Sequence, residues 1–160
     1  MDACSAILLA KASVLESCAD NQVIFMTPDV YEEVMAGKER MFPDALLVER
    51  LTENKKLKII KEDRALTKKF MQDFNMGRGE ASIVAITIKE INTLILTDNR
   101  QGRKAATINN LSLLGSIEMV VHLYQKKKIS REKAATALKI LQEEGWFEPF
   151  LIEKAREEIA

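Results

Sequence analysis

The sequence is poor in the residues on which zinc, disulfide and triad chemistry depend. It has two cysteines, Cys4 and Cys18, and one histidine, His122. Two distant cysteines without paired histidines do not make a zinc site, and with no leader sequence before them we expect reduced thiols. His122 stands in an apolar helical segment with no serine or cysteine motif near it, so we expect a structural role. A catalytic triad and RNA cleavage by paired histidines are therefore disfavoured.

Long apolar runs and an excess of one charge are also missing. No apolar run approaches the roughly 20 residues that a membrane span needs, so we expect a cytoplasmic protein with no membrane partner. Lys and Arg number 24 and so do Asp and Glu, which leaves contact with nucleic acid to local patches. With 160 residues, 47% of them hydrophobic, and no Pro/Gly/Ser linker, we expect a single domain over residues 1–160.

Residues 1–115 alternate between helical patterns and short apolar runs. Strand-like runs cover 22–27, 56–62, 92–99 and 111–115. Thr27, Pro28 and Asp29 form a helix start, with an N-cap, a proline at the first helical position and an early acid. The alternation predicts an α/β core with a mainly parallel sheet covered on both faces.

Residues 116–160 read as helices throughout, packed on the α/β core. Ser130 is the expected N-cap of one of them and Gly145 its end. We expect Trp146, Phe147 and Phe150 to pack these terminal helices together, with stacking on nucleic-acid bases as the weaker alternative. The lysine run 126–128 is expected to be the solvated end of a helix, where cations oppose the dipole.

Acidic side chains stand at several places where the carboxyl ends of parallel strands would meet. Ligands of open parallel sheets bind beyond these ends. Each acid also has a structural explanation that spacing leaves open, such as helix capping, a solvated helix surface or a turn. The acids are Asp2 before the first helix, Glu32 and Glu33 after the run at 22–27, Glu80 at a helix start, and Asp98, with Asn99, after the run at 92–99.

Three or four carboxylates within several ångström of one another would require a cation. Like charges that close cannot all stay ionised without one. Mg²⁺ or Mn²⁺ prefers carboxylate and water oxygens and can lower the pKa of a bound water for attack on a phosphodiester. Convergence of these acids would therefore indicate a metal-dependent nuclease.

Four segments resemble the ordered acidic motifs of the PIN-domain ribonucleases. They are "MDACSAILLAKASVLE", "MTPDVYEEV", "GRGEASIVAI" and "ILTDNRQGRKAA". The tail over 113–155 is similar to the C-terminal segment of an archaeal and bacterial PIN subgroup that includes VapC-like toxins. The resemblance covers nearly the whole chain. It implies a three-layer α/β/α fold, Mg²⁺- or Mn²⁺-dependent endoribonuclease activity on RNA, a homodimer, and a toxin role with an antitoxin protein as partner.

The resemblance also implies the site residues. Asp2, Glu33, Glu80 and Asp98 match the family's catalytic and metal-binding acids. The strand-end acid of the family aligns with either Asp98 or Asn99; we take Asp98 as the acid and Asn99 as a ligand or a water-positioning group.

Three cations follow the strand-end acid directly. Arg100, Arg103 and Lys104 are placed to hold an RNA backbone by phosphate contacts, which carry no sequence information. Salt bridges to the nearby acids are the alternative interpretation.

The chain departs from the family pattern at three positions. Only Met1 precedes Asp2, whereas the family has a first strand there, so the chain is truncated, has its start assigned too late, or lacks that strand. Cys4 stands where the family often has a serine, and Asn99 where it often has a second aspartate. A catalytically degenerate PIN-like module that binds RNA or protein therefore stays as an alternative. A phosphatase that uses Asp2 as nucleophile is a third.

Overall fold

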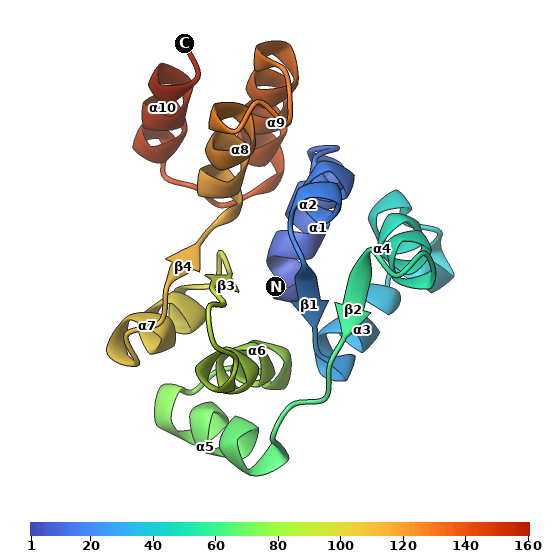
Figure 1. The fold of residues 1–160 in the computed structure, drawn as a ribbon, viewed down its shortest axis with the longest axis vertical. Coiled ribbons are helices and arrows are strands. Elements are labelled where there is room, and N and C mark those ends of the chain that lie inside the picture. Colours follow the sequence, from blue (N-terminus) through green and yellow to red (C-terminus); the bar gives the residue numbers. More distant parts are fainter.

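The computed structural model describes residues 1–160, which form ten α-helices, one 3-10 helix and four short strands. Figure 1 shows the C-terminal helices at one end of the molecule and the strands near its centre. The strands are β1 (Ile24–Met26), β2 (Leu57–Ile59), β3 (Ile95–Leu96) and β4 (Leu113–Leu114). The helices are α1 (Ala3–Lys11), α2 (Leu15–Asn21), α3 (Pro28–Met35), η1 (Lys38–Arg40), α4 (Pro43–Glu53), α5 (Arg64–Phe74), α6 (Arg78–Lys89), α7 (Arg100–Ile108), α8 (Ser116–Gln125), α9 (Arg131–Glu144) and α10 (Pro149–Glu158).

The strands form two parallel pairs. β1 pairs with β2, with Ile24 opposite Leu57, and β3 pairs with β4, with Ile95 opposite Leu113. Each strand begins and ends inside the apolar run that predicted it. The expected α/β fold with parallel strands is thereby confirmed.

The first two residues lie between the two strand pairs (Figure 1). The amino group of Met1 donates a hydrogen bond to the carbonyl oxygen of Phe25 in β1, at 2.8 Å. The next backbone N–H, that of Asp2, donates to the carbonyl of Leu96 in β3, at 3.1 Å. Donation to opposite neighbours by consecutive residues is the pattern of a strand inside a sheet. This short bridge fixes Asp2 at the carboxyl ends of β1 and β3.

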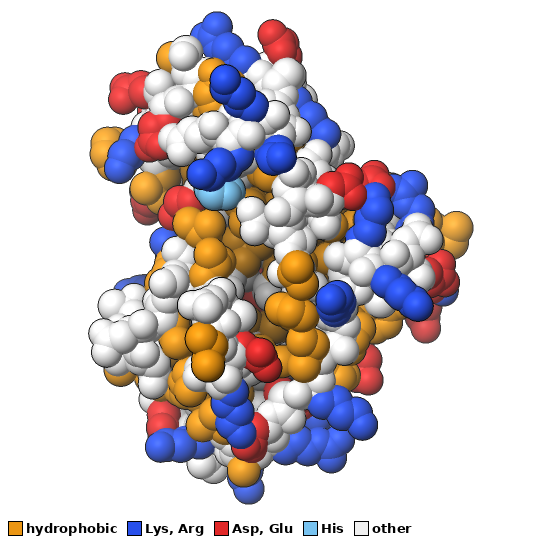
Figure 2. Space-filling view, viewed as in Figure 1, with side chains coloured by type: hydrophobic (Ala, Val, Ile, Leu, Met, Phe, Trp, Pro, Cys, Tyr) orange, Lys and Arg blue, Asp and Glu red, His pale blue; other side chains and the backbone are white.

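A groove of about 870 Å³ opens beside Met1 between these strands. Its walls include Val23 and Leu94, which are 66% and 45% exposed. Figure 2 shows hydrophobic side chains on both sides of this hollow. The two strand pairs form separate sheets that are joined by the hydrogen bonds of Met1 and Asp2.

The expected helix boundaries are confirmed at the best punctuated positions. Thr27 caps α3, with Pro28 as its first residue, and its hydroxyl oxygen accepts the backbone N–H of Val30. Ser130 caps α9, which ends at Gly145. The helical pattern of residues 5–17 is divided between α1 and α2 at Ser13, whose φ of 58° is left-handed and incompatible with a continuous helix.

The buried core is one cluster that extends from Met1 to Ile159. Helix α1 packs against both α8 and α9, so the C-terminal helices share their apolar surface with the α/β part. Leu123, Leu138 and Ile152 from α8, α9 and α10 are fully buried in this cluster. No helix combines the length and the apolarity that a membrane crossing requires.

The expected packing of the aromatic residues near the C-terminus is wrong for two of the three. Trp146 is 104% exposed and Phe150 is 73% exposed, whereas Phe147 packs against the core. A Cβ at Gly145 would lie only 2.3 Å from the Phe147 ring. Phe147 thus turns inward over Gly145, and its neighbour Trp146 points into solvent.

Candidate active site

Asp2 is the most deeply buried of the four predicted acids. It is 2% exposed and caps α1, where its Oδ1 accepts the backbone N–H of Ser5 at 2.8 Å. Its Oδ2 accepts a short hydrogen bond from the hydroxyl of Thr97, the residue after β3. These bonds tie the start of α1 to the end of β3 and hold the carboxylate in one orientation.

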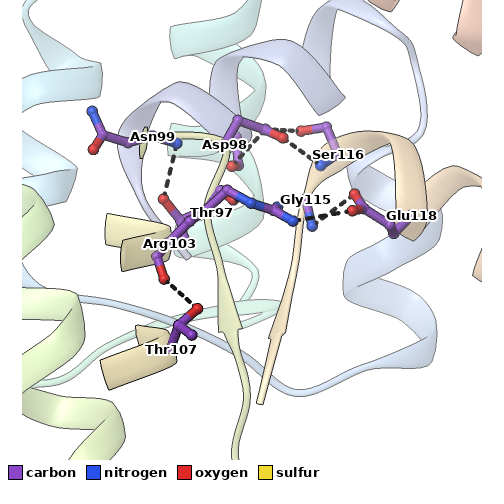
Figure 3. Close-up of polar contacts among 9 residues, drawn as sticks. Thr97, Asp98, Asn99, Arg103, Thr107, Gly115, Ser116 and Glu118 are labelled. Carbon is purple, nitrogen blue, oxygen red and sulfur yellow. Dashed lines mark hydrogen bonds and ion pairs between the residues drawn. The ribbon is translucent and has the colours of Figure 1, made fainter. Parts of the chain in front are cut away.

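Asp98 follows Thr97 and is held by three donors (Figure 3). Its Oδ1 accepts the backbone N–H of Ser116 at 2.8 Å. Its Oδ2 accepts the hydroxyls of Ser116, at 2.5 Å, and Ser5, at 2.8 Å. Burial raises the pKa of Asp98, these hydrogen bonds oppose the rise, and the Asp2 carboxylate adds to it. Ser5 binds both aspartates, so the two carboxylates form one anchored pair.

Gly115 and Arg103 complete the surroundings of Asp98. A Cβ on Gly115 would lie 2.7 Å from Asp98 Oδ1 and 2.6 Å from Glu118 Oε2, so no larger residue fits without displacing the acid. Arg103 donates to the carbonyl of Thr97 and to Glu118 Oε1, each at 3.3 Å. Glu118 in turn accepts the Gly115 N–H at 3.0 Å and caps α8. The salt-bridge interpretation therefore holds for Arg103.

Glu80 caps helix α6. Capping was the alternative to a metal-ligand role that the sequence left open. Glu80 Oε2 accepts the backbone N–H of Gly77 at 2.9 Å. One of its two carboxylate oxygens is thus used within the helix start. The carboxylate nevertheless stays close to the next acid, because its charge raises the pKa of Glu33.

Glu33 reaches from α3 to the start of α6. A Cβ on Gly79, the second residue of α6, would lie 2.8 Å from Glu33 Oε2, so glycine makes room for the carboxylate. Partial burial raises the pKa of Glu33, and repulsion by Glu80 and Asp2 raises it further. No hydrogen bond to its carboxylate offsets these effects, in contrast to the two aspartates.

The Cys4 thiol lies within the electrostatic field of all four acids. Burial raises the pKa of Cys4 from 9.0 to about 12, and the charges of Asp2, Asp98, Glu33 and Glu80 contribute in that order. Cys4 as a residue is exposed, so the rise in its pKa comes in part from the negative charges near the thiol and not from complete burial. Four acids separated by up to 96 positions, 98 minus 2, thus act on one sulfur atom.

Asn99 and two of the predicted cations lie at the edge of this cluster. Asn99 Oδ1 accepts the N–H groups of Gln101 and Gly102, at 2.8 and 3.0 Å, and so caps α7. Its side chain points away from the Asp98 carboxylate (Figure 3). Arg100 and Lys104 are exposed and make no ion pair, so both are free to contact a phosphate.

Sequence reasoning missed the residues that hold the aspartates: Ser5, Thr97 and Ser116. All three are buried, with exposed fractions of 0–1%. A signal for Ser116 was present, because "GSIE" follows the run at 111–115 and has a glutamate at the third position of a capping box. Polar residues after a strand were the criterion for Asp98, and the same criterion selects Ser116.

The donor set suits a hard divalent cation. Carboxylate oxygens are what Mg²⁺ and Mn²⁺ prefer, and repulsion among the acids, visible in the raised pKa of Glu33, is relieved by a positive charge. No three of the acidic, cysteine or histidine side chains already have the spacing of metal ligands. A cation held directly by three of them would require side-chain movement.

Short parallel strands and covering helices define an α/β protein, with acidic side chains near the strand ends. A family model described as a PIN domain matches residues 1–159, and the chain belongs to the PIN-domain family. PIN domains are generally nucleases, and PIN nucleases typically use divalent metal ions. No curated protein and no solved structure matches the chain.

Proposed function

We propose that this chain is a Mg²⁺- or Mn²⁺-dependent endoribonuclease in which Asp2, Glu33, Glu80 and Asp98 hold the metal. The observation that carries the proposal is geometric: Ser5 binds both Asp2 and Asp98, while Glu33 reaches from α3 to Gly79, the residue before Glu80. The four acids come from four separate segments and none of them makes a salt bridge to a Lys or Arg side chain, which is typical of a site built for function and not for stability.

The residues of the chain divide the work of the reaction. A bound divalent ion would supply Lewis-acid activation of water and of the phosphodiester. Asp2 and Asp98, held by protein hydrogen bonds, give the site a fixed position. Glu33 reaches the start of α6 beside Gly79 and accepts no hydrogen bond, so its oxygens are available to hold the ion and its water. In-line displacement of the 3′ oxygen leaves a 5′-phosphate and a 3′-hydroxyl.

Several finer features belong to the same proposal. Residues 1–160 form a single domain in which the two strand pairs, bridged by Met1 and Asp2, make one sheet in a three-layer α/β/α arrangement. Arg100 and Lys104 contact the RNA backbone, with Arg103 behind them, and Asn99 supports the strand end. We further propose a homodimeric toxin of the VapC-like subgroup with an antitoxin partner, which rests on the resemblance of the motifs and the tail, and a cytoplasmic location, which rests on the sequence composition.

A catalytically degenerate PIN module that binds RNA or protein is the second candidate. It is favoured by the filled hydrogen-bonding capacity of the aspartates: Asp98 accepts three bonds, and both oxygens of Asp2 are occupied. Asn99 likewise spends its oxygen on α7. In a degenerate module these oxygens would hold neighbouring segments of the chain together and would bind no metal.

Cleavage of a fluorescent single-stranded RNA by the purified protein separates the two candidates. We expect cleavage with Mn²⁺, none with EDTA, and 5′-phosphate ends on the products. Glu33→Gln should abolish cleavage, whereas Glu32→Gln, the neighbouring exposed acid on α3, should leave it unchanged. Asp98→Asn should also abolish it. RNA binding without metal-dependent cleavage would establish the degenerate module instead.

A further inference from the structure

A chain of three hydrogen bonds joins the start of helix α3 to the start of helix α6. The backbone N–H of Val30 donates to the hydroxyl oxygen of Thr27 at 3.4 Å. The hydroxyls of Thr27 and Ser82 lie 2.6 Å apart, and Ser82 donates to the carbonyl of Gly79, also at 2.6 Å. This last bond uses the single hydroxyl proton of Ser82, so Thr27 is the donor between the two side chains. Each hydroxyl therefore donates one hydrogen bond and accepts one.

Both hydroxyls are enclosed by protein. Thr27 and Ser82 are 0% exposed and lie 55 positions apart in the sequence. A buried hydroxyl that loses its partner is costly, so each of the two holds the other in place. Helices α3 and α6 pack against each other and carry Glu33 and Glu80. The hydrogen-bond chain therefore fixes one helix start against the other.

The fixed contact lies beside the two glutamates. A Cβ on Gly79 would lie 3.5 Å from Val30 Cγ2 and 2.8 Å from Glu33 Oε2, so α3 and α6 meet at this glycine. Glu33 follows Val30 by three residues and so projects from the same side of α3. Glu80 is the residue after Gly79. A separation of the two helix starts would therefore move the two carboxylates apart.

We propose that Thr27 and Ser82 are positioning residues of the acidic site. Their hydroxyls fix the spacing of the two helix starts, and thereby the region in which the two glutamate carboxylates can share one cation. This assignment rests on the proposed function, because it takes Glu33 and Glu80 as ligands of the same ion. Neither hydroxyl touches the ion or the RNA. The glutamate side chains can move, while the backbones that carry them stay in place.

Binding of Mn²⁺ in the absence of RNA tests the proposal, with the free ion measured by its EPR signal. Ser82→Ala breaks the chain at its centre and leaves Thr27 as the cap of α3. We expect the Kd for Mn²⁺ to rise by about 10-fold, the lower end of the effect of losing a group that orients metal ligands. Thr27→Val removes the other hydroxyl and should raise the Kd at least as much. Thr27→Ser keeps the hydroxyl and should bind Mn²⁺ like the wild type.

Thr87→Val is the matched control on the same helix. Thr87 is 7% exposed, and its hydroxyl donates to the carbonyl of Ile83 within α6, at 2.7 Å. The substitution should lower the free energy of unfolding and leave the Kd for Mn²⁺ unchanged. Binding is measured at a temperature at which thermal unfolding shows every variant to be folded. Equal Mn²⁺ affinities for Ser82→Ala and Thr87→Val, whether lowered or not, would overturn the positioning role.

The outcomes separate this inference from the nuclease on which it rests. At saturating Mn²⁺, Ser82→Ala should regain most of the wild-type kcat with an unchanged KM for RNA, because its defect lies in metal affinity. A Kd for Mn²⁺ that depends on Ser82, without any cleavage, would support the positioning role and refute the nuclease. Cleavage by a Ser82→Ala protein that binds Mn²⁺ like the wild type would refute the positioning role alone. Absence of Mn²⁺ binding by the wild type would refute both.

Discussion

The two halves of the acidic site are held in opposite ways. Asp2 and Asp98 accept hydrogen bonds from Ser5, Thr97 and Ser116 and cannot turn without breaking them. On the other side, Glu80 has one bond from its own helix start and Glu33 has none. We call Asp2 and Asp98 the anchored pair and Glu33 and Glu80 the free pair. The anchored pair sets where the site lies, and the free pair can move to meet a cation.

This difference reconciles converging acids with the absence of a preformed cluster of ligands. Direct coordination needs oxygens at just over 2 Å from the ion. The anchored pair can move little, so the adjustment falls on the glutamates, whose longer side chains come from helices α3 and α6. The lack of hydrogen bonds on Glu33 is therefore a property that the proposed function requires.

The largest expected effect concerns Cys4, which lies where the two pairs meet. With a pKa of about 12 in place of 9.0, its thiolate fraction at pH 8 is about a thousandfold lower than that of an ordinary thiol. Alkylation by iodoacetamide should be slowed by a factor of that order, although the residue is exposed. Peptide mass spectrometry after timed alkylation measures the rate.

Substitutions of the four acids should raise the alkylation rate of Cys4 by different amounts. Asp98→Asn should accelerate the alkylation of Cys4 more than Glu80→Gln, because the charge of Asp98 acts on the thiol more strongly. Cys18 is the internal control, since burial and not these acids raises its pKa to about 12. Alkylation of Cys4 at the rate of a free thiol would contradict the convergence of the four acids.

Ser116→Ala should weaken the anchored pair. The variant keeps the backbone N–H but removes the hydroxyl that donates to Asp98 Oδ2, leaving a buried carboxylate with fewer partners. We expect the free energy of unfolding to fall by about 1–3 kcal/mol, as measured by urea denaturation. Ser112→Ala, an exposed serine just before β4, should change it by less than about 0.5 kcal/mol. Equal effects of the two substitutions would show that Asp98 is not held as described.

The pH dependence should separate Asp98 and Glu33 from Asp63, the N-cap of helix α5. The raised pKa values of Asp98 and Glu33 mean that the folded protein keeps protons that the unfolded chain releases near 3.8 and 4.5. Their contribution therefore makes stability fall as pH rises through the window from these values to the raised ones. Asp63, paired with Lys89, has a lowered pKa and contributes in the opposite sense: its stabilisation is lost as pH falls. A carboxyl titration by ¹³C NMR in EDTA should show Asp98 and Glu33 above Asp63; the reverse order would contradict the assignment.

Much of the fold follows from local signals, and most of the anchored pair does not. Thr27 with Pro28, Ser130 and Gly145 mark helix ends through interactions within four residues, which a sequence displays directly. Asp98 was predictable as a polar residue after a buried run. Its partner Ser5 lies 93 positions away and Ser116 lies 18 away, and only the tertiary fold joins them.

The remaining errors have the same origin. The exposure of Trp146 depends on Phe147 occupying the space over Gly145, a competition between two aromatic neighbours that composition does not resolve. The dual role of Glu80 was open in the sequence. The structure adds the cap, and its ligand role stays a prediction.

The smallest effect tests the free pair most directly. At pH 7 in EDTA, Glu33→Gln removes a charge that Glu80 and Asp2 repel and that no hydrogen bond stabilises, so the variant should be more stable than the wild type. The gain should be only a few tenths of a kcal/mol, because solvent screens a carboxylate on an exposed residue. Glu32→Gln on the same helix should show no such gain, and thermal unfolding of both variants measures the difference.

Saturating Mn²⁺ should make the wild type more stable than Glu33→Gln. An ion that binds only the folded state stabilises it, and the wild type has one more carboxylate with which to bind that ion. A Glu33→Gln protein that keeps its advantage in Mn²⁺ would show that Glu33 carries repulsion without serving a metal.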